Sequence, residues 1–278
     1  MKRNQLREAI FRHLDGLVVV PVAYSLFKKG ILAHLLKEKS TTLAQITNEF
    51  HANEGYLNVA LRVLASQGFL KYEVDNVSGN VTITSLPISE FAFSLVPMYE
   101  DTFHLLTQSS VFTANKMDVD SIALLEPILK KFTENYHIHF EEDEHLRAIQ
   151  EQMLTHIEGY LVGPIVVNLG MTGMFHKYFM ESSFRADEFH KHPEAFAKIL
   201  DFFVHLGWFS KKNDNYQFTE DGFFFAKRAS AYGVTVSYLP MFKHIDNLLF
   251  GNASELRNIA KNEDEIHVNR EMNVWGSG

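Results

Sequence analysis

A run of histidine and acidic residues between positions 137 and 145 has the composition of a metal site. His137, His139, Glu141 and His145 carry the imidazole and carboxylate groups that bind Zn, Fe or Mn in proteins. If this stretch is helical, His137 and Glu141 are i,i+4 neighbours, and so are Glu141 and His145. The alternative is a solvated acidic stretch in which Phe140 to Glu144 form the exposed start of a helix. We favour this alternative and assign no metal ligand.

Two further histidines, His13 and His156, occupy matching positions in two similar segments. His13-Leu14-Asp15-Gly16 returns as His156-Ile157-Glu158-Gly159. We interpret both histidines as helix-end residues and not as catalytic bases. His190-Lys191-His192-Pro193 marks a helix start, because proline is common at the first helical position. The chain has no cysteine, and no neighbouring base marks any serine as activated, so we assign no catalytic residue.

One string, Asn168-Leu169-Gly170-Met171-Thr172-Gly173, has the glycines that a cofactor-binding loop would need. It matches Ser25-Leu26-Phe27-Lys28-Lys29-Gly30 in the similar segment, which lacks one of the two glycines. We therefore expect a helix terminus here, and we assign no cofactor-binding residue.

The similarity between the two halves extends along most of the chain. Pro21 matches Pro164 and Gly30 matches Gly173, both at the offset of 143 that relates His13 to His156. The offset then falls to 139, where 61–70 match 200–209, because the second copy is shorter. The order of the matching residues is the same in both copies, which predicts one structural unit repeated twice.

Each copy has the pattern of a winged helix, with three helices followed by a two-stranded hairpin. In the first, Thr41-Thr42 can cap a helix over Leu43–Phe50, and Asn53 can cap the next. Residues 69–74 and 81–84 then alternate as a hairpin. In the second copy, Ser182 or Ser183 is expected to cap a short helix, and Pro193 to begin the third.

The predicted fold is therefore mainly α with small β wings, in two tandem winged-helix modules joined by a helical connector. We expect the first module at 1–98, the connector at 99–155, the second module at 156–250, and a polar tail at 251–278 that leads toward an absent domain.

A winged helix suggests DNA binding, but the charges do not support it. The chain has 34 acidic residues against 26 Lys and Arg, a net charge of −8. The third helix of the first copy carries Arg62 against Glu54, whereas groove-reading helices present several basic or amide side chains. In the second copy, Lys198 stands against Glu194 and Asp201. We do not expect DNA binding.

Three motifs carry a resemblance to a known family. They are Phe27-Lys28-Lys29-Gly30-Ile31-Leu32, the segment 57–70 with Arg62, Leu64 and Gly68, and Ile83-Thr84, which returns as Phe218-Thr219. With them, Leu17 to Phe93 resembles the N-terminal winged-helix dimerisation region of class I S-adenosylmethionine-dependent O-methyltransferases. The second copy resembles it more loosely.

The resemblance implies a non-catalytic dimerisation and substrate-lid region of a methyltransferase that acts on a small-molecule acceptor. The transferase family's acidic, glycine-rich loop is missing from the sequence, so S-adenosylmethionine is expected to bind a catalytic domain that lies outside this chain. Winged-helix transcription regulators share the module, so a regulator that binds DNA or a protein is the alternative function. A stand-alone small-molecule binder is a third.

The segment Leu17–Phe27 is apolar almost all round and must be covered on several sides. We expect either a homodimer through this helix and its counterpart, 160–169, or internal pairing of the two copies. Charged residues precede the apolar run and Pro21 interrupts it, so we expect neither a signal peptide nor a membrane span. Together with the absence of cysteine, this predicts a cytoplasmic protein.

Overall fold

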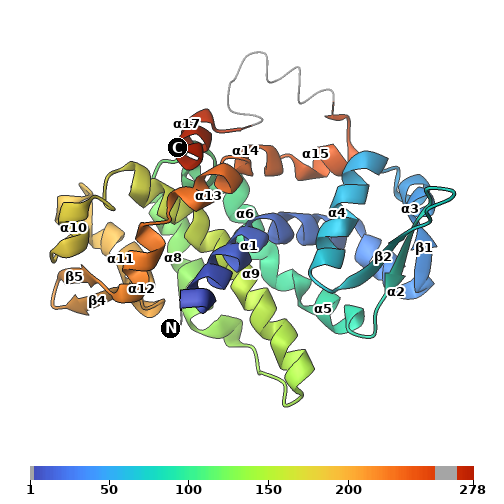
Figure 1. The fold of residues 1–278 in the computed structure, drawn as a ribbon, viewed down its shortest axis with the longest axis horizontal. Coiled ribbons are helices and arrows are strands. Elements are labelled where there is room, and N and C mark those ends of the chain that lie inside the picture. Colours follow the sequence, from blue (N-terminus) through green and yellow to red (C-terminus); the bar gives the residue numbers. More distant parts are fainter. Residues whose placement is uncertain (1–2, 254–267) are drawn as a thin grey trace.

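The computed structural model describes residues 3–253 and 268–278, and these residues are mainly helical. Their two sheets are small and antiparallel, with strand orders β1-β3-β2 and β4-β5. The two sheets lie at opposite ends of the molecule, and the long helices α1 (Arg3–Lys29) and α9 (Glu144–Met171) cross between them (Figure 1). The predicted fold class, mainly α with two small wings, is confirmed.

The first winged-helix unit follows α1 and has the predicted order of elements. It contains α2 (Ile31–Glu38), β1 (Ser40–Thr42), α3 (Leu43–Phe50), α4 (Glu54–Ser66), β2 (Leu70–Val74) and β3 (Val81–Ser85). Thr42 begins α3 in a capping box, in which its hydroxyl and the Gln45 side chain each accept a hydrogen bond from the other residue's backbone N–H. Asn53 caps α4 by accepting from the backbone N–H of Tyr56. Both predicted caps are present.

A series of short helices connects the two units. They are α5 (Ser89–Leu95), η1 (Val96–Tyr99), α6 (Glu100–Gln108), α7 (Ser110–Ala114), α8 (Val119–Thr133) and η2 (Asn135–His137). Helix α9 then begins at Glu144, where the Asp143 carboxylate accepts from two backbone N–H groups. The first helix of the second unit therefore starts 12 residues (156 − 144) before the predicted module boundary.

The second winged-helix unit has the same order with reduced elements. It contains α10 (Lys177–Glu181), η3 (Ala186–Glu188), α11 (Pro193–His205), β4 (Phe209–Lys212), β5 (Asn215–Phe218) and α12 (Glu220–Ala226). A single bridge between Phe184 and Tyr216 stands in the place of β1. The short helix that we expected after Ser182 or Ser183 is replaced by the 3₁₀ turn η3, which follows Arg185. Between the long helix and the third helix the second copy is four residues (143 − 139) shorter. There α2 and α3 have 8 residues each, whereas α10 has 5 and η3 has 3.

The chain continues through α13 (Ser230–Val236), α14 (Leu239–Phe242), α15 (Ile245–Phe250) and α17 (Arg270–Ser277). Helix α17 packs on α13, where Gly233 and Gly276 bring the two backbones together. Met272 is fully buried. The expectation of a polar tail is therefore wrong for 270–277. Residues 254–267, which include most of the expected polar stretch, lie outside the described residues.

Paired glycines show how closely the two copies correspond. Gly30 and Gly173 follow the two long helices with φ angles of 86° and 89°, in the left-handed region that favours glycine. Gly68 and Gly207 follow α4 and α11 with φ angles of 79° and 76°. The glycines that matched in the sequence therefore adopt the same left-handed backbone conformation after the corresponding helices of each copy.

Helix α1 is the centre of the core. Its residues Leu17 and Val19–Leu26 are buried by α9 and by elements from both units. Its apolar window is long enough to cross a bilayer, but 67% of that window is buried inside the protein, as in a core helix. The apolar surface on which we based the homodimer expectation is thus covered within one chain.

Candidate functional site

Helices α1 and α9 cross at two glycines that occupy the same position in the two copies. A Cβ atom on Gly16 would lie 2.2 Å from the backbone oxygen of His156. A Cβ atom on Gly159 would lie 2.4 Å from the Cα and the backbone oxygen of His13. Each glycine therefore allows close backbone contact, and each places the histidine of the other copy beside it. The repeated motif meets itself at this crossing.

The His156 ring is enclosed by residues from the first unit and the connector, and the residue is 2% exposed. Its Nδ1 lies 2.6 Å from the Tyr99 hydroxyl, and its Nε2 lies 3.0 Å from Gln67 Oε1. Burial lowers the pKa of His156 to about 3, so the ring is neutral near pH 7. Because an amide oxygen can only accept, Nε2–H donates to Gln67 and the Tyr99 hydroxyl donates to Nδ1.

The His13 ring is also 2% exposed, but its partners differ. Its Nδ1 lies 2.7 Å from the Tyr232 hydroxyl, and its Nε2 lies 3.0 Å from Glu158 Oε1. A carboxylate can only accept, so Nε2–H donates to Glu158. The Tyr232 hydroxyl completes the pair by donating to Nδ1 when the ring is neutral.

Histidine held by a tyrosine and a carboxylate or amide is an arrangement also used to orient a general base. Here both nitrogens of each ring are engaged by the protein, and each ring is buried. The two histidines therefore connect the crossing to Tyr99 and Tyr232 through buried hydrogen bonds. They lie inside long helices, so our interpretation of His13 and His156 as helix-end residues is wrong.

The histidine-rich stretch is not helical, and the helix start that we expected over Phe140 to Glu144 is formed only from Glu144. Asn135, Tyr136 and His137 have φ angles between 50° and 54°, and the backbone after them stays non-helical until Glu144. The i,i+4 relations that favoured a metal site at His137, His139, Glu141 and His145 therefore do not exist. His137 Nε2 contacts a Glu134 carboxylate oxygen at 3.1 Å instead. Among the described residues, no group of three or more His, Asp or Glu could hold a metal ion.

The glycine string at 168–173 is a helix end. Asn168 to Met171 belong to α9, and Gly173 takes the left-handed conformation after it. Both sheets in the described part of the chain are antiparallel hairpin-type sheets. These residues do not fit S-adenosylmethionine in the way that a glycine-rich loop after a parallel strand would.

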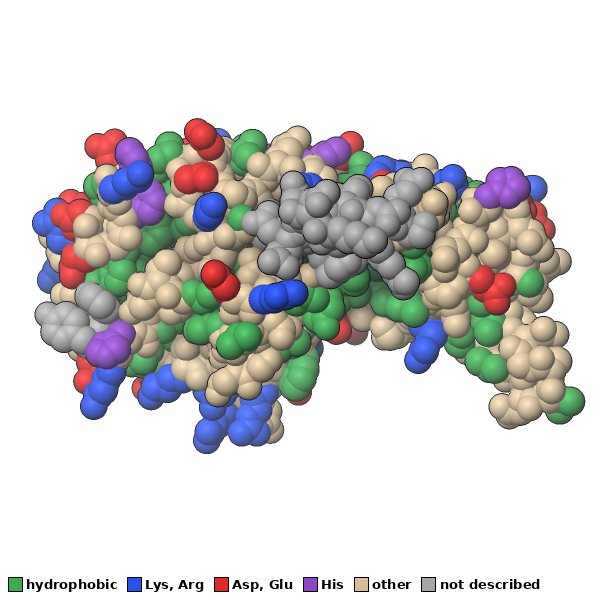
Figure 2. All heavy atoms as spheres, turned by 90° about the horizontal axis from the view of Figure 1, so that it is seen from above, with side chains coloured by type: hydrophobic (Ala, Val, Ile, Leu, Met, Phe, Trp, Pro, Cys, Tyr) green, Lys and Arg blue, Asp and Glu red, His purple; other side chains and the backbone are tan. Residues whose placement is uncertain are grey.

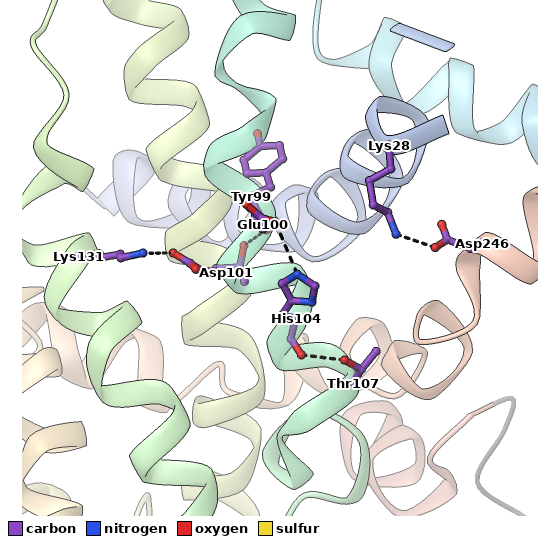
Figure 3. A network of polar contacts seen from close by, with 9 residues as sticks. Lys28, Tyr99, Glu100, Asp101, His104, Thr107, Lys131 and Asp246 are labelled. Atoms are coloured by element: carbon purple, nitrogen blue, oxygen red, sulfur yellow. Dashed lines mark hydrogen bonds and ion pairs between the residues drawn. The ribbon is translucent and has the colours of Figure 1, made fainter. Parts of the chain in front are cut away.

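Contacts between basic and acidic side chains lie on the surface around α6. Figure 3 shows three pairs: Lys28 with Asp246, Lys131 with Asp101, and His104 with Glu100. They join α1 to α15 and α6 to α8. All six side chains are at least about a third exposed, so each pair adds at most about 1 kcal/mol of stability.

Burial, and then the nearby Glu100, raise the pKa of Tyr24 to about 12.

The third helices of the two units present little positive charge. On α4 the exposed side chains include Tyr56 and Val59, and the wing beside it exposes Val74 and, at its tip, Val77, which is 97% exposed. Two basic residues of the second unit, on α11 and β4, are paired within the chain. Lys198 donates to Glu126 at 2.5 Å, and Lys211 donates to Asp201 at 2.7 Å. On the face drawn in Figure 2, acidic and basic side chains form small groups separated by apolar and uncharged surface.

Sequence reasoning did not find Gln67, Tyr99 and Tyr232 as partners of the histidines. Gln67 and Tyr99 lie 89 and 57 residues from His156, and Tyr232 lies 219 residues from His13. The counterparts of Gln67 and Tyr99 in the second copy are Leu206 and Phe242, so no repeated polar residue marked these positions. The two repeated histidines were the available signal.

Two family models match parts of this chain. No match to a curated protein was found. Residues 6–72 match the model of the AprA N-terminal domain, which covers α1 and the helices of the first unit. Residues 158–252 match the model of the AprA winged helix domain, which covers the second unit. The chain is therefore similar to AprA in two separate segments, and the winged-helix architecture of the second is shown by this match as well as by its fold.

Proposed function

We propose that this chain is a non-catalytic scaffold and substrate-lid region that works with an S-adenosylmethionine-dependent methyltransferase domain acting on a small molecule. The methyltransferase assignment is supported by the motifs in Leu17–Phe93. S-adenosylmethionine would bind that catalytic domain. A cytoplasmic location goes with this proposal, because the chain lacks cysteine.

The observation that carries the proposal is the surface of α4. In a winged helix that reads DNA, this helix presents polar and basic side chains to the groove. Here Val59 is 57% exposed and Tyr56 is 39% exposed on the same helix, and Arg62 is its basic residue. Exposed aromatic and aliphatic side chains suit contact with another protein domain better than contact with phosphates.

The fold supports a rigid accessory role. The α1–α9 crossing lies between the two units and buries the side chains of His13 and His156. A rigid arm of this kind can position two surfaces against a catalytic domain at once. The winged-helix regulator remains the second candidate, and it is favoured by the module type alone.

Calorimetric titrations of the isolated chain separate these functions. We expect no micromolar binding of S-adenosylmethionine and no salt-sensitive binding to a mixed-sequence DNA duplex. Micromolar binding of S-adenosylmethionine would contradict the non-catalytic assignment. Binding to the duplex that weakens steeply with salt would favour the regulator.

A further inference from the structure

The two ends of the α1–α9 crossing are equivalent by sequence. His13 corresponds to His156 and Asp15 to Glu158, each at the offset of 143. If both ends had kept one structure, each histidine would contact the acidic residue two positions after its counterpart. The two ends of the crossing differ in the structure. At the end with His13, which we call the closed end, the acidic residue contacts the histidine. At the end with His156, which we call the open end, a cavity lies beside the acidic residue.

At the closed end, Glu158 reaches across the crossing and its Oε1 lies 3.0 Å from His13 Nε2. At the open end, the equivalent acid is Asp15, which is one methylene shorter. Here Gln67 Oε1 accepts the hydrogen bond from Nε2–H of His156, and the Gln67 side chain also hydrogen-bonds to Asp15. The second-copy counterpart of Gln67 is Leu206, so this polar bridge belongs to one end alone.

A cavity of about 360 Å³ lies at the open end. Its polar lining includes two carboxylates, Asp15 and Glu151, the Arg12 guanidinium, and the amides of Gln67 and Gln152. This volume is within the range of small-molecule sites in proteins. Burial raises the pKa of Asp15, as expected for a carboxyl at the wall of a partly enclosed space.

The charges of the lining define the ligand class. Arg12 and Asp15 are i,i+3 neighbours on α1, so their Cβ atoms lie about 5–6 Å apart. Glu151 adds a second carboxylate from α9. A ligand with an ammonium group would pair with the carboxylates, and a carboxylate a short distance away would pair with the guanidinium. We propose that this cavity binds a free α-amino acid through both charged groups.

The test is calorimetric titration of the full chain with glycine, L-alanine and L-glutamine, with putrescine and succinate as single-sign probes. We expect saturable binding of at least one amino acid at millimolar concentration or lower. Asp15→Asn and Arg12→Gln should each weaken it at least tenfold. Glu158→Gln is the matched control, because it changes the equivalent acid at the closed end and should leave binding unchanged.

Circular dichroism establishes that each variant is folded, and the NMR signals of the His156 ring provide a second readout of binding beside Gln67. The proposal is overturned if none of the three amino acids binds, or if putrescine or succinate binds as tightly as they do. Unchanged affinity in the Asp15→Asn protein would also overturn it. These titrations involve neither DNA nor S-adenosylmethionine, so their outcome is separate from that of the proposed function.

Discussion

Replacing Gly16 by alanine should destabilise the protein strongly, because the new methyl group has no space. Its Cβ would lie 2.2 Å from the His156 oxygen, whereas ordinary contacts begin near 3.4 Å. The two helices would have to separate by about 1 Å. The obstacle is backbone, so a change of side-chain rotamer cannot relieve it. Overpacking of a core costs about 1–3 kcal/mol, and this site belongs at the upper end.

The matched control is Gly55→Ala, which changes a glycine in the first turn of α4. Its Cβ would meet one side-chain atom, Asn53 Oδ1, at an ordinary 3.5 Å. Alanine favours a helix over glycine by up to about 1 kcal/mol, and both variants receive this gain. We therefore expect Gly16→Ala to lose about 2 kcal/mol net and Gly55→Ala to be neutral or slightly stabilised. The assay is urea unfolding followed by circular dichroism at 222 nm. Equal midpoints for the two variants would refute the close backbone contact at the crossing.

Three further predictions concern single positions. His156 has a pKa of about 3 when folded against an ordinary 6.5, so the unfolded chain binds the extra proton and stability falls as the pH drops from about 6.5 toward 3. Its protonation should lower the free energy of unfolding by about 2–3 kcal/mol between pH 7 and pH 4.5. Urea titrations at the two pH values should show the stability advantage of wild type over His156→Gln falling by that amount. A constant difference would contradict a neutral buried ring. Thr42→Ala removes the capping box of α3 and should lower the free energy of unfolding by about 1 kcal/mol, measured from the urea midpoint, while an unchanged midpoint would mean that the cap contributes nothing. Gly173→Ala forces alanine to a φ of 89° and should cost about 1–2 kcal/mol in the same assay, although its Cβ meets no atom within 4 Å; a neutral result would show that the backbone at this turn relaxes freely.

Local signals predicted the winged-helix units well. The caps at Thr42 and Asn53, the start of α11 at Pro193 and the glycines after the long helices each depend on a few neighbouring residues. These signals act over one turn of chain, so they can be read without knowledge of the tertiary fold.

The connector and the chain end were predicted less well. Three consecutive residues from Asn135 to His137 adopt left-handed φ angles, which side chains other than glycine rarely favour. The backbone after them stays non-helical, so the helix start that we expected over Phe140 to Glu144 is formed only from Glu144. At the chain end, Gly276 appeared to be part of a polar terminus. It permits α17 to contact Gly233 of α13, and a contact between such distant residues leaves no local pattern.

The site at the crossing was partly visible in the sequence. Apolar residues all round Leu17–Leu26 indicated that the helix needed cover on every side, but not which element supplies it. The repeated Gly16 and Gly159 lie inside helices that need no turn there, but we did not predict a close crossing from them. The hydrogen bonds of His156 and His13 to Gln67, Tyr99 and Tyr232 could not be inferred, because these partners come from other elements and are not repeated.

The most direct test of the proposed function is methyl transfer by a captured partner. The tagged chain is incubated with extract of its source cells, and the retained material is assayed for transfer from S-adenosylmethionine labelled on its methyl group. We predict that wild type retains this activity and that Val59→Glu, which places a charge on the exposed face of α4, loses most of it. Phe11→Glu, at an apolar site on α1 that is 67% exposed against 57% for Val59, serves as the control and should retain the activity. Retention by the Val59→Glu protein equal to wild type, or no methyl transfer in any sample, would contradict the account.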